Sequence, residues 1–408
     1  MRCSRWLVGT LLLLGACGSA ERPAVLDGSV APTVTDHHAR RVEGSVGQPV
    51  DALPLLGLFT LPVRVDGVAG PPMLVDTGAP VTFLTPGAFG TTRASGTTGQ
   101  VDLAIGALTL GDVPVVWADP FGLGGTLGGV LGVNLLCQFT STWDWQRSRF
   151  TLGAAPTDAD TTDDVAPLAF RLTGGGYLQL SATRTVPVPP TRLVVDVEIE
   201  SRAFRLILDT GASSTALRDD AVSSFTSDGR GTFALDVAAQ GGLMRQRLFR
   251  ARRITALGVT RESSAVVGYS AAGLAALSEE VGSPIDGLLG ADFLQPWLTT
   301  IDYPAGQVRL RRYRDQSHVR DAWTRVGLLL SVNAAGAPVV IQVATGSDAA
   351  RQGFGVGERL VAVDGRAVAG MSGERVDLLL RGSVGESRRV RTDLREADVR
   401  VEDLIPLR

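Results

Sequence analysis

Short apolar runs alternate with polar, turn-forming stretches along most of the chain. Residues 61–68 and 193–200 are two such runs, and each is followed, after a polar turn, by a second apolar run. Runs of this length bounded by turn residues are typical of β-strands. The 49 glycines and 21 prolines supply many turns. The pattern predicts a mainly β protein, and 408 residues are enough for two or three domains.

Two parts of the chain repeat each other. Each contains an apolar run that leads into Asp-Thr-Gly-Ala, at residues 76–79 and 209–212. Each also contains a downstream Gly-apolar-Leu-Gly segment, at residues 129–132 and 287–290, and the similarity continues without a gap beyond it. A single Asp-Thr-Gly is weak evidence, because aspartate and glycine are common in turns. Two copies in the same context indicate a duplicated unit.

The duplicated motif has a chemical consequence if the two copies face each other. The glycine allows a sharp turn at the end of the strand, and the hydroxyl groups of Thr77 and Thr210 can then hydrogen-bond across to the opposite turn. The carboxyl groups of Asp76 and Asp209 would lie side by side, where they cannot both ionise and would share one proton. The ionised member can take a proton from water while the protonated one polarises a peptide carbonyl.

The amino-acid composition narrows the kinds of active site and of binding partner that the chain can have. The chain has 3 histidines and 3 cysteines, which leaves little material for a Ser-His-Asp triad or a zinc site, so we predict neither a metal nor a cofactor. All 39 basic residues are arginine and oppose 42 acidic residues, for a net charge of −3. Nucleic acid is therefore not an expected partner.

With both Asp-Thr-Gly-Ala motifs and both apolar-Leu-Gly segments, the chain resembles the aspartic proteases of the pepsin and retropepsin kind from about residue 53 to residue 312. The resemblance implies a bilobal pair of β-barrels, with lobe 1 at residues 49–160 and lobe 2 at residues 161–314. It also implies a catalytic pair and a set of supporting residues in the two turns. The catalytic pair is Asp76 and Asp209, and the supporting residues are Thr77, Gly78, Thr210 and Gly211.

Two details of the resemblance affect activity. Ala79 and Ala212 match the retroviral form of the motif, where pepsins have a hydroxyl residue. Losing a hydrogen bond to the ionised carboxylate raises the pKa of the pair, so we expect a pH optimum less acidic than that of pepsin.

Residues 93–100 and 238–244 are candidate flaps, but neither contains the flap tyrosine of pepsins. The two lobes could form one site within a monomer, which we favour, or each could pair with another chain.

The amino terminus has the features of a secretion signal. Arg2 and Arg5 precede a short apolar run that ends in Leu14-Gly15-Ala16-Cys17, similar to the lipoprotein processing box of bacteria. We predict a signal peptide at residues 1–17, lipid on Cys17 and a flexible tether at residues 18–48. The protein would be anchored by lipid to a membrane of the bacterial cell envelope, facing the periplasm or the exterior. An ordinary signal peptide is the alternative.

Cys137 and two of the three histidines have simpler interpretations. Cys137 lies in an apolar segment without a nearby histidine in the sequence, so we expect a small buried side chain rather than a nucleophile. His37 and His38 fall in the predicted tether, and we expect them to be solvated.

Residues 325–400 resemble a bacterial PDZ domain. They contain a short Ser-Asp-Ala-Ala segment at residues 347–350, a Gly-x-Gly turn, a strand and then Asp-Gly. The family's carboxylate-binding loop corresponds to Gly327, Leu328, Leu329 and Leu330, where a peptide carboxyl terminus would bind. A small β-domain that only packs against the lobes is the alternative.

These observations predict an exported aspartic endopeptidase that acts on a peptide or protein substrate. One rival hypothesis is a peptide-binding protein that uses the cleft without catalysis, and another is a protease that processes only itself. The presence of both aspartates favours the enzyme, because a binding protein has no need of a pair that shares a proton.

Overall fold

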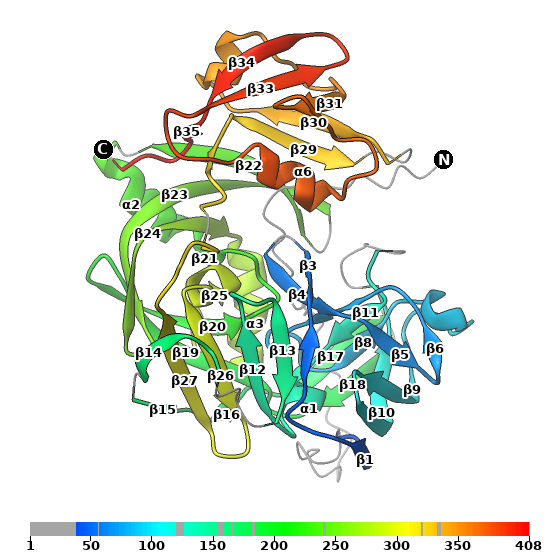
Figure 1. Ribbon diagram of the computed structural model, residues 1–408. Coiled ribbons are helices and arrows are strands. Elements are labelled where there is room, and N and C mark those ends of the chain that lie inside the picture. The colour runs from blue at the N-terminus through cyan, green and yellow to red at the C-terminus, as the bar shows by residue number, and fades with distance from the viewer. Residues whose placement is uncertain are drawn as a thin grey trace.

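The computed structural model describes residues 38–407 except 56, 120–125, 154–157, 165, 182–183, 230, 240–241, 320 and 333–335. Cys17, the signal sequence and residues 18–37 of the predicted tether lie outside this range. The described chain forms two β-rich lobes and a smaller C-terminal domain (Figure 1). The predicted mainly β fold class is confirmed. Within the described residues, no helix is long and apolar enough to cross a membrane.

Lobe 1 is built on one twisted sheet. The described strands run in the order β3-β4-β7-β11-β8-β10-β9-β5-β6, with β1 added beside β10. The lobe also contains the short helix α1 (Val133–Leu136) and the 3-10 turn η2 (Ala88–Gly90). The strands are β1 (Arg41–Gly44), β3 (Leu53–Leu55), β4 (Leu58–Leu61), β5 (Val63–Val65), β6 (Val68–Ala69), β7 (Met73–Val75), β8 (Thr82–Leu84), β9 (Thr97–Ile105), β10 (Leu108–Trp117) and β11 (Gly129–Leu131).

Strand β1 corrects part of the predicted tether. Arg41 to Gly44 pair antiparallel with Gly111 to Leu108 of β10, and the Arg41 guanidinium forms ion pairs with Asp102 and Asp112. The segment lacks an apolar period because all four of its residues are exposed, so its pattern resembled that of a flexible segment. Main-chain pairing and surface charge hold it to lobe 1 instead.

Lobe 2 repeats this arrangement with longer strands. The order of the described strands is β16-β19-β20-β25-β21-β24-β23-β22, and the hairpin of β17 and β18 lies apart from it. The helices of this lobe are α2 (Asp219–Phe225), α3 (Ala271–Val281) and α4 (Ala291–Leu294), with the 3-10 turn η3 (Thr226–Asp228). The strands are β16 (Leu172–Thr173), β17 (Gly176–Ser181), β18 (Arg184–Val188), β19 (Arg192–Ile199), β20 (Arg202–Asp209), β21 (Thr215–Arg218), β22 (Thr232–Ala239), β23 (Gly242–Ala256), β24 (Val259–Tyr269) and β25 (Gly287–Gly290).

The repeated sequence motifs form the same strand pairings in both lobes. The strand before each Asp-Thr-Gly turn pairs in parallel with the apolar-Leu-Gly strand, β7 with β11 and β20 with β25. The apolar-Leu-Gly strand, β11 or β25, pairs on its other side with the strand after the turn, β8 or β21. Lobe 2 has more residues between its two motifs than lobe 1 has, and these residues include α2, β22 and α3. The duplicated sequence therefore encodes a duplicated structural unit.

A third sheet joins the two lobes. Its central pair is β12 of the first repeat and β26 of the second, and Thr142 lies opposite Thr300 in the register. The two hydroxyl oxygens are 3.1 Å apart. These threonines align with each other in the sequence repeat, so an approximate twofold axis passes between them. The described strands of this sheet are β2 (Pro49–Asp51), β12 (Thr140–Asp144), β13 (Arg149–Leu152), β14 (Thr161–Asp164), β15 (Leu168–Ala169), β26 (Trp297–Asp302) and β27 (Gln307–Tyr313).

The C-terminal domain has its own apolar core, which contains Val326, Leu328, Leu330, Val390 and Val399. Its two helices begin at serine N-caps, as is common for helix starts: Ser347 accepts from the Ala350 amide and Ser372 from the Arg375 amide. The elements are β28 (Thr324–Arg325), β29 (Leu328–Val332), β30 (Pro338–Val343), α5 (Asp348–Arg351), β31 (Leu360–Val363), β32 (Arg366–Ala367), α6 (Gly373–Leu379), β33 (Ser387–Thr392), β34 (Glu396–Arg400) and β35 (Glu402–Asp403).

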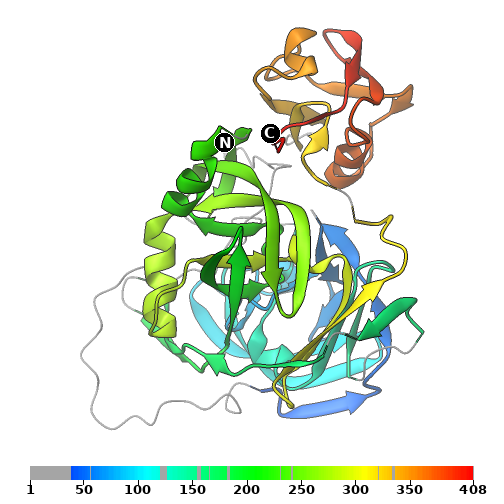
Figure 2. The ribbon, with the colours of Figure 1, turned by 90° about the vertical axis from the view of Figure 1, so that its left-hand side faces the viewer.

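The C-terminal domain sits against lobe 2 (Figure 2). The ring of Trp323 lies 5.9 Å from that of Phe233 on β22, and the two belong to an apolar cluster that includes Leu329 and Ile405. The guanidinium of buried Arg250 on β23 pairs with the Asp403 carboxylate at 2.7 Å. Apolar packing and a largely buried ion pair therefore join the domain to lobe 2.

Candidate active site

The two aspartates lie where the centres of the two lobes meet. Asp76 directly follows β7, and Asp209 is the last residue of β20. Both strands lie in the interior of their sheets, so both side chains are buried, with exposed fractions of 2% and 1%. The structure thus brings together two carboxyl groups that are 133 positions apart in the sequence.

The threonines hold the two turns against each other. The Thr77 hydroxyl oxygen accepts from the Thr210 amide at 2.9 Å, and the Thr210 hydroxyl oxygen accepts from the Thr77 amide at 3.1 Å. Each hydroxyl also donates across the interface, Thr77 to the Leu208 carbonyl and Thr210 to the Val75 carbonyl. These four bonds form the crossed arrangement expected from the sequence. They fix the relative position of the two lobes at the aspartates.

The glycines of the turns are required by the close approach of the carboxyl groups. The Gly78 amide donates to Asp76 Oδ1 at 2.6 Å, and the Gly211 amide donates to Asp209 Oδ1 at 2.8 Å. A Cβ atom on Gly78 would lie 2.5 Å from Cγ of Asp209, and one on Gly211 would lie 2.3 Å from Cγ of Asp76. Any side chain here would therefore displace the opposite carboxyl group.

The electrostatic environment favours one shared proton. Burial raises the pKa of Asp76, although a hydrogen bond with the Asp209 carboxyl group opposes this shift. Burial raises the pKa of Asp209 well above its ordinary value, and the neighbouring charge of Asp76 raises it further. Asp209 is therefore the better holder of the proton and Asp76 the better base.

Arg192 and Glu280 are site residues that the sequence motifs did not reveal. Arg192 begins β19 and is 2% exposed, and its guanidinium binds the Glu280 carboxylate through two hydrogen bonds of 2.6 and 2.8 Å. Its Nη1 donates to the carbonyl oxygen of Gly78 in the opposite lobe. Its positive charge lowers the pKa of both aspartates. The sequence signal was weak: a charged residue directly before the short apolar run at residues 193–195.

Cys137 is buried as expected, and burial raises the pKa of its thiol to about 12. A thiol with this pKa is not a nucleophile near neutral pH. His38, expected to be solvated, instead lies partly buried with Nε2 3.2 Å from Cys137 Sγ. The strand pairing of the neighbouring β1 brings His38 back to lobe 1.

The two candidate flaps differ in the structure. Residues 93–100 include the start of β9, and Arg93 lies over the ring of Trp117. Residues 238–244 join β22 to β23, with residues 240–241 outside the described range. Only the second candidate lies at the end of a long hairpin.

The predicted carboxylate-binding loop of the C-terminal domain is largely buried. Gly327 has a positive φ of 79°, and Leu328, Leu329 and Leu330 are at most 1% exposed. Leu328 and Leu330 pack into the core of the domain, whereas Leu329 joins the apolar cluster against lobe 2. These side chains serve packing, so any peptide contact here would involve the main chain. The binding role stays a prediction.

Comparison with known proteins bears on lobe 2. Residues 195–293 match the family model described as aspartyl protease. The matched segment contains Asp209 and β25, and it supports the resemblance to aspartic proteases. A solved aspartic proteinase from Irpex lacteus is 15% identical, with a TM-score of 0.39, and the alignment covers 67% of this chain and 99% of that one. The comparison with curated proteins gave no match.

Proposed function

We propose that this chain is an aspartic endopeptidase that hydrolyses peptide bonds with Asp76, Asp209 and a water molecule. One observation carries the proposal: two buried, hydrogen-bonded carboxyl groups are held face to face by reciprocal threonine bonds. The match of residues 195–293 to the aspartyl protease family supports it. Lobe 1 lies outside that match, and its role rests on the repeat and on the geometry of its turn.

The two carboxyl groups take complementary roles in this reaction. The Asp76 carboxylate removes a proton from water as the water oxygen attacks the carbonyl carbon of the peptide. The Asp209 carboxyl group gives its proton to the carbonyl oxygen, which produces a tetrahedral diol. The diol then returns a proton to Asp209, the nitrogen accepts the proton from Asp76, and the C–N bond breaks. The carboxylic acid and amine leave, and Asp209 is again protonated.

The remaining parts of the proposal concern location and recruitment. The Leu14-Gly15-Ala16-Cys17 box supports export and lipid attachment at Cys17 on a bacterial envelope membrane. The PDZ-like sequence supports a C-terminal domain that binds peptides or regulates the protease, and β29 leaves one edge free of strand pairing among the described residues.

The direct test is cleavage of a mixed peptide library by the parent chain and by the Asp76→Asn and Asp209→Asn variants. Asparagine keeps the shape of the side chain but cannot carry the shared proton. We expect cleavage by the parent alone, with Asp220→Asn, a substitution on the exposed face of α2, as the active control. Equal products from the parent and both dyad variants would overturn the proposal.

A further inference from the structure

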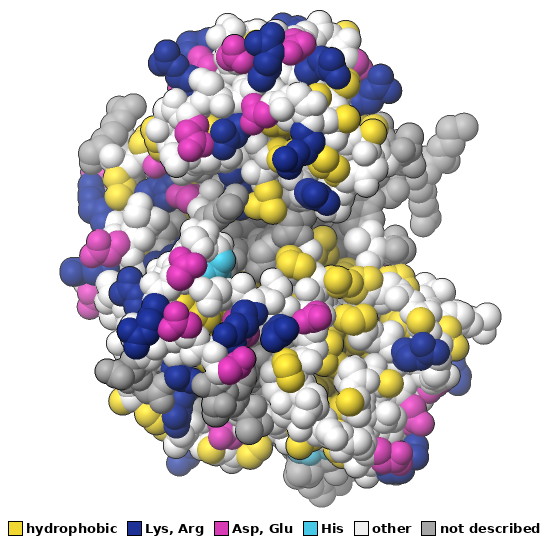
Figure 3. Space-filling view, viewed as in Figure 1, with side chains coloured by type: hydrophobic (Ala, Val, Ile, Leu, Met, Phe, Trp, Pro, Cys, Tyr) yellow, Lys and Arg dark blue, Asp and Glu magenta, His cyan; other side chains and the backbone are white. Residues whose placement is uncertain are grey.

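A cavity of about 950 Å³ lies between lobe 2, one side of lobe 1 and the C-terminal domain. Figure 3 shows the surface hollowed between the C-terminal domain and the lobes below it. The volume is within the range of ligand sites. The lining does not contain Asp76 or Asp209, but it includes Ser213 and Ser214, which directly follow the second Asp-Thr-Gly-Ala motif. The cavity is thus distinct from the dyad and adjoins its lobe-2 loop.

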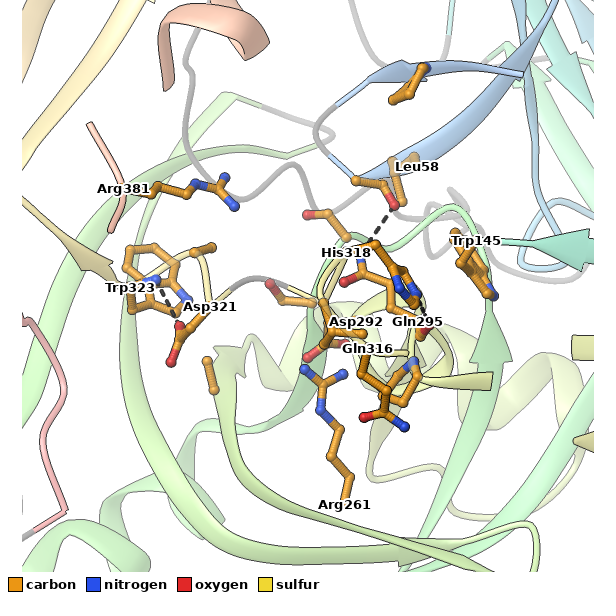
Figure 4. Close-up of a pocket in the computed structure, with 18 of the residues that line it drawn as sticks. Leu58, Trp145, Arg261, Asp292, Gln295, Gln316, His318, Asp321, Trp323 and Arg381 are labelled. Carbon is orange, nitrogen blue, oxygen red and sulfur yellow. Dashed lines mark hydrogen bonds between the residues drawn. The ribbon is translucent and has the colours of Figure 1, made fainter. Parts of the chain in front are cut away.

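The walls of the cavity come from three parts of the chain. Arg261 and Asp292 belong to lobe 2, Trp323 directly precedes β28, and Arg381 follows α6 (Figure 4). Asp377 of α6 also lines the cavity. Asp292, which is half-buried, accepts hydrogen bonds from the amide and the hydroxyl group of Thr215, six residues after Asp209. One wall therefore supports the strand that follows the catalytic turn.

The cavity has more hydrogen-bond donors than its own acceptors satisfy. Arg250 pairs with Asp321 and Asp403, and one carboxylate, Asp377, serves both Arg325 and Arg381. Among the described residues, Nη1 of Arg261 and Nε of Arg325 have no hydrogen-bond partner, but both atoms are covered by protein, so a ligand in the cavity would meet other nitrogens of these guanidinium groups. Buried donors are nearly always satisfied in folded proteins.

Two arginines of this lining form no ion pair with a described carboxylate: Arg312, which is exposed, and Arg261, which is half-buried. No ion pair within 4.0 Å joins Arg261 to a described carboxylate, although it interacts at longer range with Asp292 and Asp321. In Figure 4 its guanidinium points toward Asp292, inside the cavity. Burial raises the pKa of Asp292 and lowers that of Arg261, and the attraction between the two charges opposes both shifts.

We propose that this cavity binds a carboxylate of a peptide, with Arg261 as its cationic anchor. A carboxylate in the cavity supplies the close counter-charge that Arg261 lacks among the described residues, and hydrogen bonds between a guanidinium and a carboxylate are charge-assisted. Apolar side chains such as Trp145, Trp297 and Leu378 line the same space and suit the rest of a peptide. The carboxylate can come from a chain terminus or from an Asp or Glu side chain.

This site goes beyond the proposed hydrolysis and does not depend on it. Binding is therefore measured with the full-length Asp76→Asn chain, which cannot cleave by the proposed mechanism. The probes are four fluorescein-labelled pools of degenerate octapeptides, read by fluorescence polarisation. One pool has no acidic residue and an amidated end, and the second differs by a free carboxyl terminus. The third has one Glu and an amidated end, and the fourth replaces that Glu with Gln.

We expect the free-acid pool, the Glu pool or both to bind about tenfold more tightly than their neutral partners, the size expected for a charge-assisted hydrogen bond. Arg261→Gln in the same background should abolish this preference. Arg366→Gln should retain it, because Arg366 is an exposed residue of the C-terminal domain outside the lining. Preference for the free-acid pool identifies a chain terminus as the source, and preference for the Glu pool identifies a side chain.

Preference for the Glu pool over the Gln pool needs no substitution in the cavity, and both pools lack the free carboxyl terminus that the predicted loop at residues 327–330 would bind, so this comparison remains valid if Arg261→Gln unfolds. Equal binding of all four pools would overturn the proposal. An acid preference that persists in a folded Arg261→Gln variant would also overturn it.

Discussion

Arg192 of lobe 2 donates a hydrogen bond to the carbonyl oxygen of Gly78 in lobe 1. The same guanidinium is bound on its other side by Glu280 at the end of α3. One buried ion pair therefore contacts the turn that holds Asp76, and its positive charge acts on both carboxyl groups of the dyad.

Replacing Arg192 with Met should shift the pH profile of cleavage. The cation favours the ionised form of the dyad, so its removal raises the dyad pKa and moves the acid limb of the profile to higher pH. Glu280 would also lose its bidentate partner, at a cost of about 3–5 kcal/mol in the free energy of unfolding. Rates measured across pH and denaturant unfolding check the two effects.

The double variant Arg192→Met/Glu280→Gln separates charge from packing. It lacks the uncompensated carboxylate, so it should recover part of the stability and keep the shifted acid limb. An acid limb at the parent position in both variants would limit Arg192 to a structural role.

Replacing Thr77 or Thr210 with Val should destabilise the junction by similar amounts. Each change removes one hydroxyl group that accepts from the opposite amide and donates to a buried carbonyl. We expect about 2–4 kcal/mol from each, since buried groups lose their partners. The double variant should lose less than the two single losses added together, because the four bonds form one network.

Thr142→Val is the matched control for these threonine variants. It also removes one member of a buried threonine pair across the lobes, but its hydroxyl contact with Thr300 lies in the joining sheet. Denaturant unfolding should show a smaller loss, and cleavage should be kept. An effect on cleavage equal to that of Thr77→Val would contradict the special role of the turns.

The contribution of Asp76 and Asp209 to stability should fall as the pH rises above about 4. Both aspartates have a pKa raised above the ordinary 3.8, so the folded chain keeps a proton that the unfolded chain has already lost. The unfolded state then binds fewer protons, and the free energy of unfolding decreases through the window from 3.8 up to the folded pKa, by at most about 1.4 kcal/mol per pH unit for one proton.

Asp209→Asn should reduce this pH dependence, since Asp209 has the more strongly raised pKa. Urea unfolding at a series of pH values measures the slope, and exposed Asp220→Asn should leave it unchanged. A slope in the Asp209→Asn variant equal to that of the parent would contradict the assignment of the proton.

Gly78→Ala should abolish cleavage and lower stability by about 1–3 kcal/mol, the usual cost of overpacking. The new methyl group would lie 2.5 Å from Cγ of Asp209 and force the carboxyl groups apart. Gly355→Ala is the control, because its Cβ would meet no atom nearer than 3.4 Å. Kinetics and thermal unfolding of the two variants provide the comparison, and an active Gly78→Ala chain would show that the spacing is not critical.

The candidate dyad could be predicted from the sequence because its motif occurs twice and consists of neighbouring residues. Asp76 and Asp209 each stand at the end of an apolar strand and two residues before a glycine, so two short motifs were enough to pair them. The crossed bonds of Thr77 and Thr210 followed from the same reasoning. The strand at residues 41–44 was missed because an exposed edge strand has no apolar period.

The sequence by itself determined the mainly β fold, the duplication and the two turns that carry the aspartates. Each depends on residues that are neighbours along the chain, where periodicity and turn chemistry act. Only the tertiary structure decided that Arg192 and Glu280, 88 positions apart, contact the Gly78 turn, and that Arg261 faces a cavity. Burial and the pairing of charges arise from packing between distant segments, and no local pattern specifies them.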